Sequence, residues 1–418
     1  MREVLEEEAL RADWTTDLRK RAKDRLSKSS PSEMGLDLSR FRMLQPRDES
    51  ASSVASLPRE VREASEAVGV VGDETARSGT YFQLDATALM KKVAVKGLEI
   101  MSLEDAFDQL DLKRYYWNAV PVDKDGFTSA VELYGKGGYV IVARRGHKVE
   151  LPVQACLFMK ANESLQAPHN LIVAEEDSSV DIITGCTSMP EKNGLHVGVS
   201  EFYVKKGARV TFTMIHGWTH DIHVRPRTGV MVEEGGTFVS HYVNLNPLST
   251  LQMYPAVRLN GRAARTSLSS LLVGLGKSRM DVGAEIEFNA PDTKGEIISK
   301  SVGTGDSTVY ARGRLVGNVD GVRGHLECRG LIMNPKSRVY AIPELMGNAM
   351  DVELTHEASV GKLSQDQIYY LMSKGFTDEE ATSILVRGFM ETKIEGIPPM
   401  LDSMIRSVTD IVASRAVG

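Results

Sequence analysis

The feature that most constrains this chain is a run of about 240 residues, from Trp117 to Glu357, in which helical patterns hardly appear. Short stretches rich in Val, Ile, Thr, Tyr and Phe alternate with turns of Gly, Asn and Asp, as in F-Y-V-K-K-G-A-R-V-T-F and V-M-V-E-E-G-G-T-F-V-S. Such stretches are typical of β-strands joined by turns. An all-β run of this length folds as a sandwich, a barrel, a propeller or a solenoid.

A loose repeat within the run favours the solenoid. Similar turn-plus-strand units recur at Val180, Val210 and Phe238, and Ile297 lies close to two further steps along the chain. The step between units is roughly 30 residues, which is typical of a β-solenoid, in which each coil stacks on the one before. We therefore predict a mainly β protein with a solenoid core over residues 117–357.

The N-terminal region, residues 1–116, is rich in charge and mostly helical in character. Residues 3–26 carry apolar side chains at helical spacing, and residues 103–110 follow a possible cap at Ser102 with Asp105 three positions on. Between these segments, residues 45–58 are rich in Ser, Pro and charge, which predicts a mobile linker.

The C-terminal region, residues 358–418, also has a helical pattern. Ser364 with Gln367, and Thr377 with Glu380, have the spacing of capping boxes. Two consecutive prolines at 398–399 then interrupt the chain before a last predicted helix over residues 400–413.

Composition excludes several classes of protein. The net charge of -6 gives no reason to expect nucleic acid as a partner. No run of about 18 apolar residues exists, and the start M-R-E-V-L-E-E-E is unlike a signal peptide, so we expect a cytoplasmic protein without a membrane span. Three widely spaced cysteines, Cys156, Cys186 and Cys328, do not form a disulfide framework, and Cys156 in A-C-L-F-M is expected in the core.

The candidate chemistry lies near the end of the β run. Cys328, His356 and Glu357 offer a thiol, an imidazole and a carboxylate, which together can hold iron. Cys328 and Glu357 are separated by about one coil, so they are expected to stack on neighbouring rungs roughly 4.8 Å apart. The alternative is a buried thiol, a solvated carboxylate and a histidine bonded to the backbone.

A second pair has nearly the same spacing. Cys186 and His216 are also separated by about one coil and are expected to stack in the same way. Cys186 and Cys328 are separated by about five coils, or roughly 24 Å along the solenoid axis. They cannot bind one ion, but they could form the two ends of a route.

Two other patterns carry less weight. His216, His220 and His223 have a spacing that would suggest zinc on a helix, but Gly217 and the strand-like flanks remove that geometry. The stretch G-L-G-K-S at 274–278 lacks the first glycine of a phosphate-binding loop, so no nucleotide site is expected there.

From about Tyr81 to Phe389 the chain resembles the SufB/SufD family of iron–sulfur cluster assembly proteins, and its SufB branch in particular. The resemblance rests on the following segments: V-K-G-L-E-I-M-S-L-E-D-A, Y-Y-W-N-A-V-P-V-D-K-D-G-F-T-S-A-V, I-V-A-E-E-D-S-S-V-D-I-I-T-G-C-T-S-M, I-I-S-K-S-V-G, Y-A-R-G-R-L-V and E-L-T-H-E-A-S-V-G-K-L-S-Q-D-Q-I-Y-Y-L. The last of these is highly specific, whereas G-C-T and S-K-S alone would be weak.

The resemblance implies a central right-handed parallel β-helix flanked by helical regions. It also implies a scaffold, not an enzyme, that builds a transient iron–sulfur cluster from iron and a donor's sulfur and passes it to apoproteins. SufC, an ABC-type ATPase, would dock on the C-terminal helices. By the same resemblance, Cys328 holds the nascent cluster and Glu357 is a ligand. His356 falls where SufD supplies an imidazole, and Cys186 falls where SufB accepts sulfur.

This sequence departs from SufB in two respects. Around the assembly cysteine SufB usually reads Q-C-D-S, whereas this chain has E-C-R-G at 327–330, and the N-terminal CxxCxxxC motif of some SufB proteins is absent. Because one chain carries Cys328, His356 and Glu357 together, we expect a homodimer in place of a SufB–SufD pair. His216 is expected near the Cys186 end of the route. The alternative function is that of a β-helix polysaccharide hydrolase or lyase, which would need an acidic cluster on one face of the coils.

Overall fold

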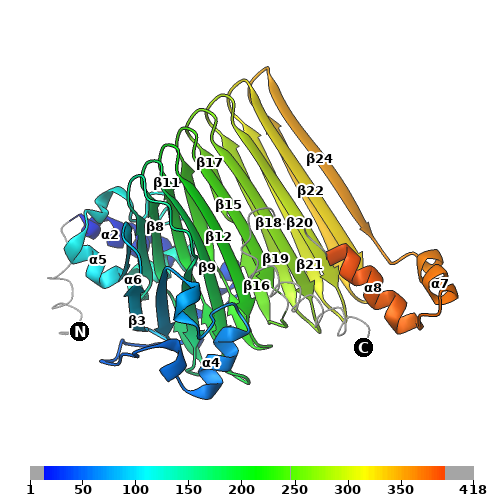
Figure 1. Cartoon of the computed structure of the whole chain (residues 1–418), viewed down its shortest axis with the longest axis horizontal. Helices are drawn as coiled ribbons and strands as arrows, with labels where there is room; N and C mark the ends of the chain where they lie inside the picture. The colour runs from blue at the N-terminus through cyan, green and yellow to red at the C-terminus, as the bar shows by residue number, and fades with distance from the viewer. Residues whose placement is uncertain (1–13, 245, 391–418) are drawn as a thin grey trace.

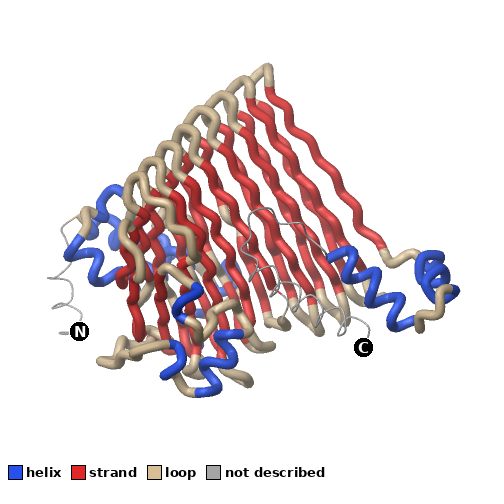
Figure 2. Tube along the Cα trace, in the orientation of Figure 1, coloured by secondary structure: helices blue, strands red, loops and turns tan. Residues whose placement is uncertain are grey.

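The predicted solenoid is confirmed. A computed structural model describes residues 14–244 and 246–390, and Figure 1 shows parallel strands stacked rung upon rung from β8 to β24. The solenoid has about eight turns, with helices gathered at its two ends (Figure 2). The strands of the first coils are buried on both faces and are rich in apolar residues, whereas those of the later coils alternate between buried and more exposed residues.

Two sheets form the walls of the solenoid. The first contains, in chain order, β2 (Gly79–Leu84), β3 (Thr87–Val93), β6 (Val153–Met159), β9 (Ser179–Ser188), β12 (Arg209–Gly217), β15 (Thr237–Asn244), β18 (Arg265–Gly274), β20 (Lys294–Gly303), β22 (Val322–Ile332) and β24 (Val352–Gly361). The second contains β1 (Arg42–Met43), β4 (Leu98–Ser102), β5 (Tyr139–Ala143), β7 (Ser164–Gln166), β8 (His169–Ala174), β10 (Gly194–His196), β11 (Val199–Val204), β13 (Ile222–Val224), β14 (Arg227–Val232), β16 (Thr250–Met253), β17 (Ala256–Leu259), β19 (Arg279–Phe288), β21 (Thr308–Gly317) and β23 (Arg338–Gly347).

The register agrees with the repeat that the sequence predicts. Val210 pairs with Val180 on one side and with Phe238 on the other. Ile297 pairs with Leu268, two positions further along the strand, and so lies on the same face as the other three. The space between the two sheets is a continuous apolar core, in which the ring of Phe202 contacts those of Phe212 (edge-on) and Phe238 (tilted), with centroids 4.8 and 5.0 Å apart.

A row of asparagines lines one corner of the solenoid. Asn289 donates its side-chain amide to Asn260 at 2.9 Å, Asn318 donates to Asn289 at 2.7 Å, and Asn348 donates to Asn318 at 2.8 Å. Each rung thereby satisfies the polar side chain of the next, which fixes the turn at the same place in successive coils.

The N-terminal region contains more strand than predicted. The helices and 3-10 turns there are α2 (Thr15–Lys28), α3 (Pro31–Met34), η1 (Leu38–Arg40), η2 (Val54–Ser56), α4 (Arg59–Glu66), η3 (Glu74–Ala76), α5 (Leu103–Gln109) and η4 (Leu112–Arg114). The cap of α5 is confirmed, since Ser102 and Asp105 form a capping box. Strands nevertheless occur from β1 onward, and β2 pairs with β6, so both sheets include strands from well before residue 117.

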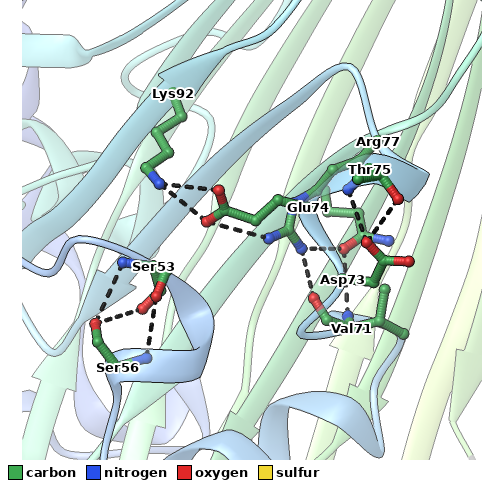
Figure 3. Close-up of polar contacts among 9 residues, drawn as sticks. Ser53, Ser56, Val71, Asp73, Glu74, Thr75, Arg77 and Lys92 are labelled. Carbon is green, nitrogen blue, oxygen red and sulfur yellow. Dashed lines mark hydrogen bonds and ion pairs between the residues drawn. The ribbon is translucent and has the colours of Figure 1, made fainter.

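The predicted mobile linker at 45–58 is folded against the sheet. It contains η2, whose Ser53 and Ser56 form a capping box, and it buries Val54 and Leu57. Its serine residues form the cap of this turn. Figure 3 shows the neighbouring polar contacts, in which the buried Arg77 donates to the Val71 carbonyl at 2.5 Å and to Gln154 at 2.9 Å.

Helix α6 (Gly126–Tyr134) begins at Asp125, which accepts the first backbone N–H groups of the helix. At the other end of the chain, α7 (Gln365–Ser373) and α8 (Asp378–Met390) follow the last strand (Figure 1). The capping box of Thr377 with Glu380 is confirmed. That of Ser364 is wrong, because its side chain makes no cap hydrogen bond.

Helix α8 packs on the outer face of the first sheet, where Val386 and Met390 join the apolar cluster that contains Val302 and Leu331. The predicted helix over residues 400–413 lies outside the described residues. Within those residues, no helix is long and apolar enough to cross a membrane.

Candidate functional site

Cys328 faces the interior of the solenoid, one rung from its end. It lies on β22, is 1% exposed, and belongs to the apolar core between the sheets. Burial, and secondly the nearby carboxylate of Glu327, raise the pKa of the thiol to about 11. The thiol is therefore protonated at neutral pH, and a metal that binds there must displace its proton.

The predicted stacking of Cys328 on Glu357 is wrong. Cys328 pairs with Ala358, and Glu357 pairs with Glu327. The reason is that the coil from β22 to β24 is one residue longer than each of the two coils before it. Successive side chains of a strand point to opposite faces, so a shift of one residue moves the carboxylate to the outer face.

His356 lies on the same face as Cys328. It pairs with Leu326, two positions before Cys328 on β22, and its Nε2 atom is buried without a hydrogen-bond partner among the described residues. A buried imidazole nitrogen with no partner is available as a metal ligand. Ala358 is the residue of β24 directly over the thiol, and in the described part of the chain β24 pairs only with β22.

The predicted stacking of Cys186 and His216 is confirmed. The two residues pair directly between β9 and β12, and both are buried, at 0% and 2% exposure. Burial, followed by the charge of Cys156, raises the pKa of the Cys186 thiol well above its ordinary value. Burial, followed by His196, lowers the pKa of His216 well below its ordinary value, so the ring is neutral.

Polar side chains lie on the inner face of the strands between the two cysteines. The inward-facing row that ends at Cys328 runs back through Ser299, Ser270 and Tyr242 on successive strands. Ser270 donates to Ser299 at 3.1 Å, and the Tyr242 hydroxyl lies 2.7 Å from Nδ1 of His216. Sequence reasoning missed these three residues, although stepping back from Cys328 by the coil length would have found them.

A cavity lies along this row. It has a volume of about 40 Å³ and is lined by Tyr242, Ser270 and Ser299 together with apolar side chains. That volume exceeds what a single water molecule requires, roughly 10–15 Å³ by the same measure. The cavity is mostly apolar, with the hydroxyl groups of the row on its wall, and it lies beside the strands between Cys186 and Cys328.

Between the strand of Cys186 and the strand before Cys328, four buried polar atoms have no hydrogen-bond partner among the described residues: His216 Nε2, Trp218 Nε1, Asn244 Oδ1 and Ser301 Oγ. Asn244 pairs with His216, and Ser301 follows two strands further on the same inner face. Buried polar groups are normally satisfied, so these four atoms mark polar positions inside an otherwise apolar core.

The remaining candidates behave as structural residues. Cys156 lies in a separate apolar cluster with Val54 and Phe158, as predicted. His223 contacts Thr250 at 2.8 Å. Among the described residues, no group of three or more His, Cys, Asp or Glu is placed to hold a metal ion. Cys328, His356 and Glu357 therefore do not form a complete metal site within one chain as it stands.

The comparisons with known proteins agree with this architecture. The family model described as "SUF system FeS cluster assembly, SufBD core domain" matches residues 157–389. An iron–sulfur cluster assembly SufBD family protein of Methanothermobacter thermautotrophicus (strain Delta H) is 40% identical, over 87% of this chain and 90% of its own. One from Archaeoglobus fulgidus is 42% identical over 82% of this chain and 93% of its own. The iron–sulfur cluster assembly protein SufB of Bacillus subtilis is 31% identical over 85% of this chain and 78% of its own.

The family match covers the strands that carry Cys186 and Cys328 as well as both described C-terminal helices. It gives no support to the alternative of a polysaccharide hydrolase or lyase. From its fold, its register and its relatives, this chain belongs to the SufBD family of iron–sulfur cluster assembly proteins.

Proposed function

We propose that this protein is the scaffold subunit of a SUF machine and acts without catalytic turnover of its own. Sulfur enters at Cys186, moves through the interior of the solenoid, and is combined with iron at Cys328 into a nascent cluster, which is the cargo of the protein. The observation that carries the proposal is that both thiols face one interior, five strand steps apart from β9 to β22, with a polar row between them.

The residue types suit a cluster that must be released. Thiolate sulfur binds iron–sulfur clusters strongly, whereas imidazole and carboxylate ligands hold them less firmly. Cys328, on β22, and His356, on β24, supply ligands from the inner face of the sheet. Glu357, also on β24, supplies one from the outer face. We place assembly at the free edge of the last strand, because a cluster at that edge can take ligands from both faces of the sheet.

A second copy of the chain completes the site in this proposal. The last coil exposes five large apolar side chains: Tyr340, Leu345, Met346, Met350 and Val360. An exposed group of this kind marks a surface that another protein covers. Unpaired strand edges also favour contact with a further strand. A homodimer formed through these coils brings two copies of Cys328 and Glu357 to one seam. A SufD-like paralogue would serve in the same position.

We assign the docking of the SufC ATPase to the helices after β24. Tyr369, Tyr370, Met372, Phe376 and Ile384 on and between α7 and α8 are each between 38% and 62% exposed, which is a large apolar surface for two short helices. ATP-driven movement of this tail would act on the assembly edge directly, because α7 follows β24 after a short connection.

Anaerobic reconstitution with iron, sulfide and SufC, followed by absorbance spectroscopy, tests the proposal. Wild-type protein and Cys156→Ala should develop the absorbance of an iron–sulfur cluster, and Cys328→Ala should not. Cys156 is the matched control, since it is an equally buried thiol in a different cluster. The absence of a chromophore in wild type, or an undiminished one in Cys328→Ala, would refute the assignment.

The docking assignment has its own test. Tyr370→Ser should weaken the capture of SufC in a pull-down, whereas Tyr340→Ser, which removes an exposed tyrosine from the last coil, should leave it unchanged. If both variants capture SufC equally well, the tail is not the docking surface.

A further inference from the structure

A groove with a cationic wall lies on the outside of the solenoid, away from the interior that holds Cys186 and Cys328. Its volume is about 240 Å³, and it lies between residues 32–35 and the strands β16, β19 and β21. The polar side chains that line it include Arg225, Thr250, Gln252, Arg279, Asp281 and Tyr310. Neither the family match nor the proposed scaffold function assigns a role to this groove.

Arg225 is a buried cation without a carboxylate beside it. The residue is 5% exposed, and no ion pair joins it to any described residue. Its Nη1 donates to the carbonyls of Val224 at 2.9 Å and Thr250 at 3.2 Å, and its Nη2 donates to the Thr250 hydroxyl at 2.8 Å. Burial, and then the charge of Arg227, lower its pKa to about 10. A buried charge with no counter-ion is unfavourable.

Arg227, two residues later, is built in the same way but carries its counter-ion. Its Nη1 donates to the carbonyls of Pro226 at 3.0 Å and Gln252 at 3.1 Å, and both guanidinium groups lie over the ring of Phe127, at 5.2 Å for Arg227 and 5.6 Å for Arg225. The difference is at Nε. In Arg227 this atom donates to the Asp125 carboxylate at 2.6 Å, whereas in Arg225 it is buried with no partner among the described residues.

A second cation faces the same groove. Arg279 is exposed at the first position of β19 and pairs in register with Thr250, the residue that holds Arg225. No ion pair joins Arg279 to another described residue. Asp281 does not neutralise the two arginines, because its carboxylate accepts from Arg312 at 2.5 Å. The groove thus presents two guanidinium groups whose charge is not balanced within the described chain.

We propose that this groove binds an oxyanion, a phosphate-type or carboxylate group, which takes at Arg225 the place that Asp125 occupies at Arg227, with Arg279 as the second contact. Guanidinium groups favour these anions because their N–H groups match the spacing of the oxygens. The site is separate from cluster assembly, since it lies on the outer wall and involves none of the residues assigned to sulfur or iron.

Isothermal titration calorimetry on the full-length protein tests this, with inorganic pyrophosphate and malonate in separate titrations at constant ionic strength set by KCl. Binding of either anion by the wild type supports the site and identifies its class, and binding of neither overturns it. Arg279→Ala should weaken binding about tenfold or more, since a hydrogen bond to a charged group is lost. Arg265→Ala is the matched control, an exposed arginine at the first position of β18, and should bind as wild type does.

Arg225→Lys keeps the positive charge but removes the Nε donor, and it should weaken binding while the far-UV circular dichroism spectrum stays native. Wild-type affinity in either Arg279→Ala or a folded Arg225→Lys would overturn the proposal. If Arg225→Lys does not fold, Arg279→Ala decides the question alone, because its side chain is exposed and its loss leaves the core intact.

Discussion

The protonated state of Cys328 leads to a quantitative prediction about its reactivity. With a pKa of about 11 against an ordinary value of 9.0, only about one thiol in a thousand is ionised at pH 8, compared with about one in ten for an unperturbed cysteine. Because the thiolate is the nucleophile, Cys328 in the folded protein should react with iodoacetamide about a hundredfold more slowly than a free cysteine. Its 1% exposure should slow the reaction further.

The pH dependence has a definite sign. The thiolate fraction of a group with a pKa of about 11 rises about tenfold for each pH unit between 8 and 10, so the alkylation rate should rise in the same proportion. Glu327→Gln removes the negative charge that is the second cause of the raised pKa, and should speed alkylation at pH 8. Iron should bind more tightly as the pH rises over the same range, because binding releases the thiol proton.

Peptide-resolved mass spectrometry measures this reaction separately for each of the three cysteines. Cys156 and Cys186 are internal references, since both are fully buried and the pKa of Cys156 is raised to about 12. In urea all three should react at one rate. A Cys328 that reacts within tenfold of a free cysteine in the folded state, or whose rate is flat between pH 8 and 10, would refute the reasoning.

Three further predictions concern the route, the tail and the seam. Ser299→Leu fills the cavity of about 40 Å³ that is lined in part by Ser299, the register partner of Cys328. Isotope-labelled mass spectrometry should then show that sulfur loaded on Cys186 no longer reaches Cys328, while cluster formation from free sulfide persists in the same variant. Equal transfer in the variant and the wild type would exclude this path. Val386→Asp places a charge in the apolar cluster beneath α8, at a cost on the order of 3 kcal/mol. The helix should detach and SufC capture should be lost, while the β-sheet circular dichroism signal stays unchanged. Retained capture would contradict this prediction. Met346→Glu should shift the protein from dimer to monomer in size-exclusion chromatography with light scattering, whereas Met43→Glu, at the opposite end, should not.

Much of the architecture could be predicted from the sequence because a solenoid repeats its own geometry. The spacings among Val180, Val210 and Phe238 indicated the coil length, and that length placed His216 on Cys186 correctly. The same coil length placed Glu357 wrongly on Cys328. Coils of this protein differ by a residue, and in a strand one residue decides which face a side chain takes.

Other errors had local causes. Strands β2 to β4 were missed because they are short and alternate with charged segments that resemble helices, and because the parallel partner of β2 is β6, which comes much later in the sequence. Composition alone predicts a mobile segment at 45–58, whereas Val54 and Leu57 give it an apolar side that packs. Contacts between segments that are far apart in the sequence leave no pattern within either segment.

The asparagine row at the corner has a consequence for how two copies can meet. The amides of Asn289, Asn318 and Asn348 each donate to the asparagine one coil closer to the N-terminus, so the row has a direction, and within the described residues it ends at Asn348 with an acceptor, the side-chain oxygen Oδ1. A donor group can extend such a row. A second copy related by a twofold axis would instead bring an identical oxygen against it, and two acceptors repel each other. The corner therefore sets a limit on dimer geometry: a twofold seam must run over the strands of the last coil and leave the corner to solvent.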